Sequence, residues 1–270
     1  MPERQPYQGP ARKLVLAFDI GTTYGGVSCS ILDPGEPPVI SGVTRFPATD
    51  HVSLARSGEA LQESVIERAE DEEWVRVEWW KLHLRPKNLA SNHVTDQDLP
   101  PLPTNRSAIQ ILSDFMGYLF RCSKTYIQDS HVSGPEMWGS FENNIDFVLS
   151  HPNGWEGPQQ TQIRRAAVLA GLVPDSPEGQ ARIQLVTEGE ASIHFCLSTE
   201  KTAGSFKQDQ GIMIIDAGGG TIDVSSYYMT TSPPTFLPFT ARNQIACSHV
   251  ICNEVQRTSI SPRNCLHFGA

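Results

Sequence analysis

Short apolar runs bounded by glycine, proline and polar turns organise the start of the chain. Residues 14–19 form one β-type run that closes at Gly21, and the apolar pattern resumes over 27–32. Apolar runs of this length between turn residues are typical of strands. The pattern therefore predicts two strands joined by a tight turn, and a third strand over 39–43 after the break at Pro37 and Pro38.

Helical spacing dominates the next stretch. Residues 58–73 are acidic, free of proline and apolar at helical spacing, and residues 104–130 repeat apolar positions every three or four residues. Thr104 or Ser107 can cap the second segment, so we expect one long amphipathic helix that ends near Ser130. The segment 86–103 between them holds four prolines, which favours a surface connection.

Strand-type and helix-type segments alternate after residue 143. The pattern predicts strands over 144–150 and 182–187, and helices over 157–171 and 189–197. Residues 211–216 are apolar on both faces, which suits a central strand of a covered sheet. This alternation indicates the α/β class. We expect the strands that hold Asp19, Val27, Phe147, Leu185 and Ile214 to form one mixed sheet flanked by helices.

Two of the apolar runs share the same ending. Residues 16–23 read LAFDIGTT and residues 214–221 read IIDAGGGT, so each run ends in an aspartate followed by glycine and threonine. Glycine lets a turn approach an anion, amide and hydroxyl groups donate to phosphate oxygens, and aspartate holds a hydrated Mg²⁺. Either copy alone is also common hairpin chemistry. The pair predicts two hairpins that grip a polyphosphate from both sides.

These motifs resemble the nucleotide-binding domain of the 70-kDa heat-shock chaperones, within the superfamily of actin, sugar kinases and chaperone ATPases. The matching segments are FDIGTTY (18–24), WWKL (79–82), RRAAVLAGL (164–172), LVTEGEA (185–191) and IDAGGGTIDVS (215–225). The wording HPNGW at 151–155 is more similar to the divergent fungal and animal relatives of the chaperone. The resemblance covers roughly residues 13–230.

The resemblance implies an α/β protein with the actin-like ATPase (ribonuclease H-like) fold, its first lobe complete and its second lobe partial. Residues 1–12 would be a disordered lead, and 13–203 the first lobe with an insertion subdomain at about 46–102. Residues 209–230 would start the second lobe with the second phosphate motif. The tail, 231–270, matches nothing in the family and stays unassigned.

The resemblance further implies a site for ATP and Mg²⁺ between two lobes. Asp19 and Asp216 would hold the metal through water, while Lys81 and Glu188 would serve the attacking water and the hydration shell of the metal. Asp216 and Thr221 would also take part in catalysis. Phosphate contacts would come from Gly21, Thr22, Thr23 and Tyr24 on one side, and from Gly218, Gly219, Gly220 and Thr221 on the other.

Three of these positions have simpler interpretations. Lys81 lies on an aromatic-rich segment that would also suit a surface lysine. Glu188 could merely cap the helix expected from Gly189. Asp223 is most simply a turn or strand-edge residue, although the family places it near the phosphates.

The expected activity is ATP hydrolysis by a chaperone-like ATPase domain, with ATP and ADP as ligands and protein clients or co-chaperones as partners. A sugar or small-molecule kinase of the same superfamily shares the first motif. A non-catalytic remnant is the other alternative, because residues 230–270 show no adenosine-type motif. On that account we expect weak binding of Mg-ATP with little preference over GTP.

Charge and composition limit the classes of partner that we expect for this chain. Thirty acidic against 21 basic residues give a formal charge of −9, which argues against a nucleic-acid footprint. The apolar run near the start is too short for a bilayer and lacks the organisation of a signal peptide, so we expect a cytoplasmic protein without membrane contact. Six scattered cysteines favour reduced thiols, and Cys247, His249 and Cys252 lack the paired spacings of a zinc site.

Overall fold

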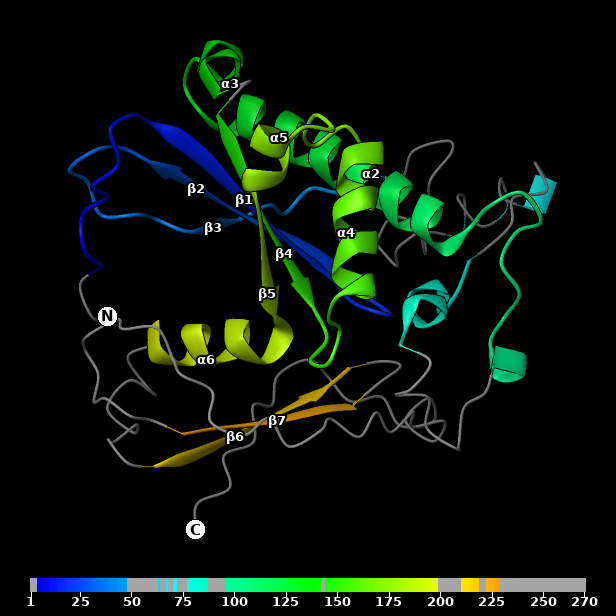
Figure 1. Cartoon of the computed structure of the whole chain (residues 1–270). Coiled ribbons are helices and arrows are strands. Elements are labelled where there is room, and N and C mark those ends of the chain that lie inside the picture. Colours follow the sequence, from blue (N-terminus) through cyan, green and yellow to red (C-terminus); the bar gives the residue numbers. More distant parts are fainter. Residues whose placement is uncertain are drawn as a thin grey trace.

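The computed structural model of the chain describes residues 4–47, 63, 67, 70–71, 77–86, 96–141, 144–198, 210–218 and 222–228. These residues form a mixed sheet of five strands, helices packed against it, and a separate two-stranded sheet (Figure 1). The α/β class predicted from the sequence is therefore confirmed.

The main sheet has the strand order β3-β2-β1-β4-β5. Its strands are β1 (Lys13–Ile20), β2 (Gly25–Leu32), β3 (Ser41–Gly42), β4 (Ile145–His151) and β5 (Ile183–Thr187). Strand β1 runs antiparallel to β2 and parallel to β4, which is parallel to β5. This order and these directions are those of the predicted ribonuclease H-like fold. The carboxyl ends of β1, β4 and β5 consequently lie at one edge of the sheet.

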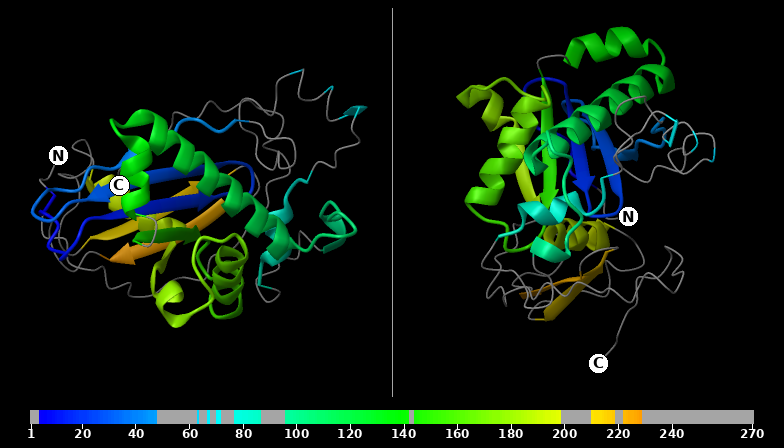
Figure 2. Two further views of the ribbon diagram at one scale, coloured as in Figure 1. Left: turned by 90° about the horizontal axis from the view of Figure 1, so that it is seen from above. Right: turned by 90° about the vertical axis from the view of Figure 1, so that its right-hand side faces the viewer.

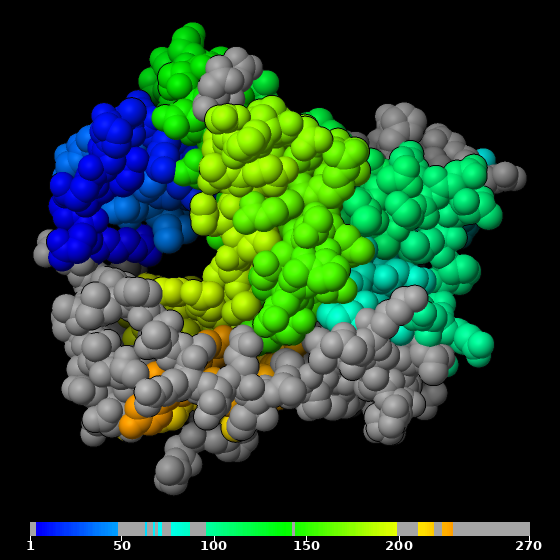
Figure 3. All heavy atoms as spheres, viewed as in Figure 1, coloured from blue at the N-terminus to red at the C-terminus, as the bar shows by residue number. Residues whose placement is uncertain are grey.

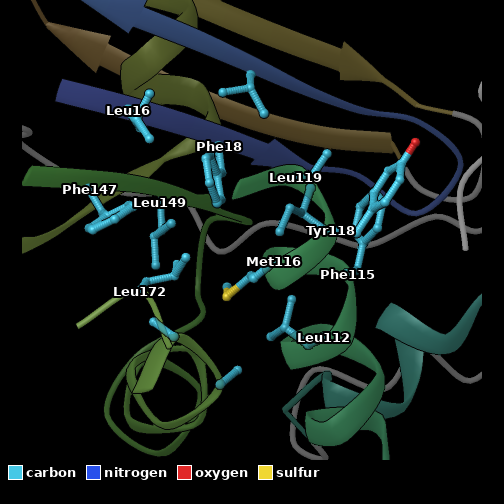
Figure 4. Close-up of a cluster of buried hydrophobic side chains, with 14 of the residues drawn as sticks. Leu16, Phe18, Leu112, Phe115, Met116, Tyr118, Leu119, Phe147, Leu149 and Leu172 are labelled. Carbon is cyan, nitrogen blue, oxygen red and sulfur yellow. The ribbon is translucent and has the colours of Figure 1, made fainter. Parts of the chain in front are cut away.

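The hydrophobic core lies on one face of the main sheet. Alternate side chains of β1 and β4, among them Leu16, Phe18 and Phe147, are almost completely buried there. Helices α2 (Ala108–Ser130) and α4 (Pro158–Leu169) cover them, and Met116 and Leu119 of α2 face the strands (Figure 4). Burying each large apolar side chain contributes about 1.5–3 kcal/mol. This packing fixes the strands whose ends carry the polar residues of interest.

Helix α2 shows how the sequence sets an element boundary. The Ser107 hydroxyl accepts from the Gln110 amide, and the Gln110 side chain accepts from the Ser107 amide at 2.8 Å. This capping box satisfies two amides that the first turn leaves without helical partners. Of the two predicted caps, the helix uses Ser107 rather than Thr104, and it ends at Ser130 as predicted.

Helix α6 (Glu188–Ser198) lies between the main sheet and a hairpin of β6 (Gly211–Ala217) and β7 (Ile222–Tyr228) (Figures 1 and 2). Ile193 and Leu197 of α6 pack against Tyr227 of β7, beside two isoleucines of β6. In the space-filling view a hollow separates the N-terminal strands, in blue, from the region of α6, in yellow (Figure 3). Because α6 packs against the hairpin on one side and contacts β4 and β5 on the other, it connects the hairpin to the main sheet.

Strand β6 corrects one prediction. We expected the strand of Ile214 to lie centrally in one mixed sheet, but among the described residues β6 pairs with β7 alone. Ile214 faces α6, whereas Met213 and Ile215 on the other face are 64% and 58% exposed. The expectation of a single sheet is wrong because α6 lies between the hairpin and the main sheet. Apolar residues on both faces did not indicate two covered faces here.

Other elements differ less. The predicted third strand is reduced to Ser41–Gly42, because Val39 and Ile40 are exposed and pair with no described strand. Sequence reasoning missed helices α3 (Gly134–Phe141) and α5 (Pro177–Ala181) and the 3-10 helices η1 (Trp80–Leu84) and η3 (Asp96–Asp98). Most of the predicted helix at 58–73 lies outside the described residues, and residues 63, 67, 70 and 71 are helical. The tail, 231–270, also lies outside them.

In the segment expected to be a disordered lead, the Tyr7 amide donates to the Glu36 carbonyl at 2.9 Å. None of the helices in the described ranges is long and apolar enough to span a membrane. Cys29 is a buried free thiol, while Cys247, His249 and Cys252 lie outside the described residues.

Candidate active site

Asp19 lies at the carboxyl edge of the main sheet, on the face opposite the core. The parallel register pairs Phe18 with Leu149, which brings the next residues of β1 and β4 side by side. The Ser150 hydroxyl donates to the Asp19 carboxylate at 2.8 Å. Asp19 itself is exposed, so its carboxylate is oriented by a neighbouring strand and still open to a ligand.

The turn after Asp19 is closed by a backbone hydrogen bond. The Gly21 amide donates to the Tyr24 carbonyl at 2.8 Å, and a Cβ atom at Gly21 would lie only 2.7 Å from that oxygen. The close approach explains glycine at this position. Thr22 and Thr23 are half-buried and Tyr24 is exposed. The Thr23 hydroxyl oxygen is buried and has no hydrogen-bond partner among the described residues.

The second predicted motif lies on the β6–β7 hairpin. Its antiparallel register places Asp216 opposite Asp223, so both carboxylates share the face that looks toward α6. Asp223 is 3% exposed. Gly218 is exposed at the end of β6, whereas Gly219, Gly220 and Thr221 lie outside the described residues. Asp223, which the sequence alone left as a turn or strand-edge residue and the resemblance placed near the phosphates, lies in β7 and belongs to the same polar cluster as Asp216.

Lys81 and Glu188 form a buried ion pair across 107 positions of sequence. The Lys81 Nζ atom lies 2.8 Å from the Glu188 carboxylate, and Lys81 is only 7% exposed. Lys81 comes from η1, and Glu188 is the first residue of α6. The burial and the partner distinguish Lys81 from a solvated surface lysine.

Electrostatic effects link the aspartates of the two motifs with the ion pair of Lys81 and Glu188. Burial raises the pKa of Glu188, and the charges of Asp223 and Asp19 raise it further, against the opposing effect of Lys81. Burial likewise raises the pKa of Asp216, again with contributions from Asp223 and Asp19. Asp19 of β1 and Asp223 of β7 thus act on both Glu188 of α6 and Asp216 of β6, and Lys81 opposes their effect on each. The site is rich in negative charge.

Residues 151–155 contribute neighbours that sequence reasoning did not assign to the site. The Lys81 Nζ atom lies 5.7 Å from the centre of the Trp155 ring, and Trp155 is 4% exposed. His151 is buried, and burial lowers its pKa, with the positive charge of Lys81 acting in the same direction. The segment HPNGW was the available signal, but no local periodicity connects it with Lys81.

Helix α6 begins in close contact with the hairpin. A Cβ atom at Gly189 would lie 2.4 Å from the Ser225 hydroxyl, 2.6 Å from the Tyr227 hydroxyl and 3.0 Å from the Asn153 side-chain nitrogen. Within the described part of the chain, these three buried polar atoms have no hydrogen-bond partner. Glycine at 189 therefore lets β7 approach the helix that carries Glu188.

The donor set suits a hydrated divalent cation. Among the described residues, no three His, Cys, Asp or Glu side chains are placed to ligate a metal ion directly. Asp19 and Asp216 instead offer carboxylates to the water shell of an ion, which Mg²⁺ retains more readily than most metals. A cation there would also offset the repulsion that raises the pKa of Asp216.

Comparison with solved structures gives likenesses at low sequence identity. No protein-family model matches the chain. The chain is similar to the Ppx/GppA enzyme of Aquifex aeolicus, at 14% identity and a TM-score of 0.26, over 83% of this chain and 51% of that one. It is also similar to nucleoside triphosphate hydrolases of Neospora caninum, at 10% identity and a TM-score of 0.35, over 87% and 41% of the two chains. The chain thus spans about half the length, or less, of these solved structures.

Proposed function

We propose that this chain binds Mg-ATP and hydrolyses it to ADP and inorganic phosphate. The observation that carries the proposal is the grouping of the carboxylates of Asp19, Asp216, Asp223 and Glu188 near the buried Lys81, beside the glycine turn that follows Asp19. Carboxylates from two separate sheets have no evident structural reason to face each other. Their mutual repulsion is instead what a bound cation would relieve.

The roles of the residues follow from their positions. Asp19 and Asp216 would hold the water shell of Mg²⁺, which, when bound, neutralises charge on the phosphates. The amides of the Gly21 turn and the Thr23 hydroxyl, which has no partner among the described residues, are available to phosphate oxygens. The residues at 218–221 would act from the opposite side, as the sequence motif indicates.

Hydrolysis requires a water molecule to attack the terminal phosphorus while the bond to the leaving ADP oxygen breaks. Such a reaction depends mainly on positioning and on electrostatic stabilisation of the developing charge. Lys81 supplies a buried positive charge for this purpose, and its ammonium group lies 2.8 Å from the Glu188 carboxylate. The mechanism therefore requires no covalent bond between the protein and the phosphate.

The choice of ATP and of a chaperone-like role rests on the sequence motifs alone. The strings FDIGTTY and IDAGGGTIDVS support an ATPase of the chaperone type over other members of the actin-like superfamily. Protein clients and co-chaperones would be the corresponding partners. This finer part of the proposal is independent of the chemistry proposed for the site.

Phosphate release from ATP tests the proposal. We expect Mg-dependent hydrolysis that falls at least about a hundredfold in Asp19→Asn and in Asp216→Asn, the scale of losing a preorganised electrostatic group. Asp175→Asn is the matched control, because Asp175 is exposed and pairs with Arg165 outside the site. Release that requires an added sugar would identify a kinase instead. Binding of Mg-ATP without any release would identify a non-catalytic nucleotide-binding protein.

A further inference from the structure

Lys81 is held from two directions. Its ammonium group lies 2.8 Å from the Glu188 carboxylate and 5.7 Å from the centre of the Trp155 ring. Lys81 is 7% exposed and Trp155 is 4% exposed, so water screens neither contact well. The three residues come from η1, from the start of α6 and from the segment after β4.

A carboxylate alone fixes a lysine poorly. The lysine side chain is a flexible stem of four methylene groups that ends in a compact charge, so it has many rotamers. Its ammonium group can therefore move together with the carboxylate that it contacts. A second attraction from another direction restrains the ammonium group. An aromatic face attracts the charge without being a conventional hydrogen-bond acceptor. The ammonium group has three N–H donors, and those not bound to Glu188 stay available to a phosphate oxygen or a water molecule.

We propose that Trp155 is a positioning residue, which holds the Lys81 ammonium group in place through a cation–π contact. Trp155 is not a catalytic residue, since it acts on the reaction only through Lys81. Its role in turnover rests on the function proposed above, whereas its contact with Lys81 does not. A purely structural tryptophan would fill space, and any apolar side chain of similar size would then replace it.

Two variants separate these roles. Trp155→Phe keeps an aromatic face and Trp155→Leu keeps only apolar volume. We expect kcat to fall about threefold in Trp155→Phe and about tenfold or more in Trp155→Leu, with KM changed much less, since cation–π contacts of buried groups reach this scale. Equal kcat in the two variants at equal folded fraction would overturn the proposal.

A second readout does not depend on activity. Amine labelling of Lys81, followed by mass spectrometry of the peptide, reports how well its ammonium group is held. We expect labelling to rise severalfold in Trp155→Leu and less in Trp155→Phe, while Lys124, which lies 5.7 Å from the Trp138 ring, keeps its rate. If the unmodified chain hydrolyses no ATP, the proposed function fails, and the labelling result still decides whether Trp155 holds Lys81.

Fluorinated tryptophan covers the case in which Trp155→Leu does not fold. Fluorine weakens the negative face of the ring and hardly changes its shape, so the core stays filled. The fluorinated amino acid replaces all five tryptophans of the chain. The variant Trp155→Phe, grown with the same amino acid, is therefore the control that shows the effect of the other four. Fluorination should raise the labelling of Lys81 in the chain with Trp155 and leave it unchanged in Trp155→Phe. An equal effect in both backgrounds, or none in either, would overturn the proposal.

Discussion

Asp216 bears an electrostatic cost in the folded chain. Burial and the neighbouring charges of Asp223 and Asp19 raise its pKa, so the folded state holds its proton to higher pH than the unfolded state does. Stability must then fall as pH rises from the ordinary aspartate pKa, about 3.9, through the raised value. A carboxylate whose pKa is raised by burial and by neighbouring negative charges is typical of a functional site.

Replacement of this carboxylate should stabilise the folded chain while it lowers the rate of ATP hydrolysis. We expect Asp216→Asn to unfold at higher urea concentration than the unmodified chain at pH 7, and the difference to vanish as pH falls below about 4. Urea unfolding measured across this pH range checks the prediction. The control Asp175→Asn, at an exposed residue outside the site, should show no such gain at pH 7. A loss of stability in Asp216→Asn would mean that the carboxylate has a structural partner.

Lys81 provides the second prediction at the scale of a residue. Lys81→Ala should lower turnover by on the order of a hundredfold or more, the scale of losing one preorganised electrostatic stabiliser. It also leaves the buried Glu188 without its positive partner, so stability near pH 7 should fall as well. Turnover per folded molecule separates the two effects. Lys124→Ala is the control, because Lys124 also lies over a tryptophan but away from the site. Unchanged turnover in Lys81→Ala would remove the lysine from the mechanism.

At the scale of elements, the contact between α6 and β7 joins the two sheets. Gly189→Ala would place a methyl group 2.4 Å and 2.6 Å from the hydroxyls of Ser225 and Tyr227. Overpacking of this kind typically costs about 1–3 kcal/mol. We expect the hairpin to move away from α6, with a loss of stability in that range and a weaker affinity for Mg-ATP. Thermal unfolding and nucleotide titration measure the two effects.

The matched control for this change is Gly139→Ala in α3. No atom lies within 4 Å of a Cβ at Gly139, so alanine should fit there without loss. Removing both hydroxyls with Ser225→Ala and Tyr227→Phe should restore part of what Gly189→Ala loses. If the single and the combined variants are equally affected, the close approach of β7 to α6 does not determine the affinity.

The elements also show what a sequence can predict. Strands β1 and β4 and helix α2 follow from periodicity, because each buries one face or stripe. Strands β2 and β5 and helices α4 and α6 were also predicted from the sequence pattern. The position of β6 does not follow, since its exposed Met213 and Ile215 have the same apolar character as its buried neighbours. Helix α5 has five residues, too few for a periodic pattern to register.

The candidate site was predictable in part. The two aspartate–glycine–threonine motifs can be recognised from short contiguous stretches of sequence. The family resemblance supplied Lys81 and Glu188 as candidates. Nothing in the sequence indicates that these two residues meet at 2.8 Å, or that Trp155 lies against Lys81, because such contacts depend on how η1 and α6 pack. For the same reason, the sequence alone described Asp223 as a turn or strand-edge residue. Only the register of the hairpin places it opposite Asp216.

At the scale of the whole molecule, the site takes its aspartates from two separate sheets and Glu188 from the helix between them. A ligand held by both should therefore stabilise both together, by about RT ln(1 + [L]/Kd), which is about 2.7 kcal/mol at a concentration a hundredfold above Kd. We expect Mg-ATP to slow hydrogen exchange in the turn between β1 and β2 and in the β6–β7 hairpin with the same dependence on concentration. Asp216→Asn should weaken this protection in both places, although it changes only one. Protection confined to the β1–β2 turn would mean that the hairpin takes no part in binding, and the shared site would have to be abandoned.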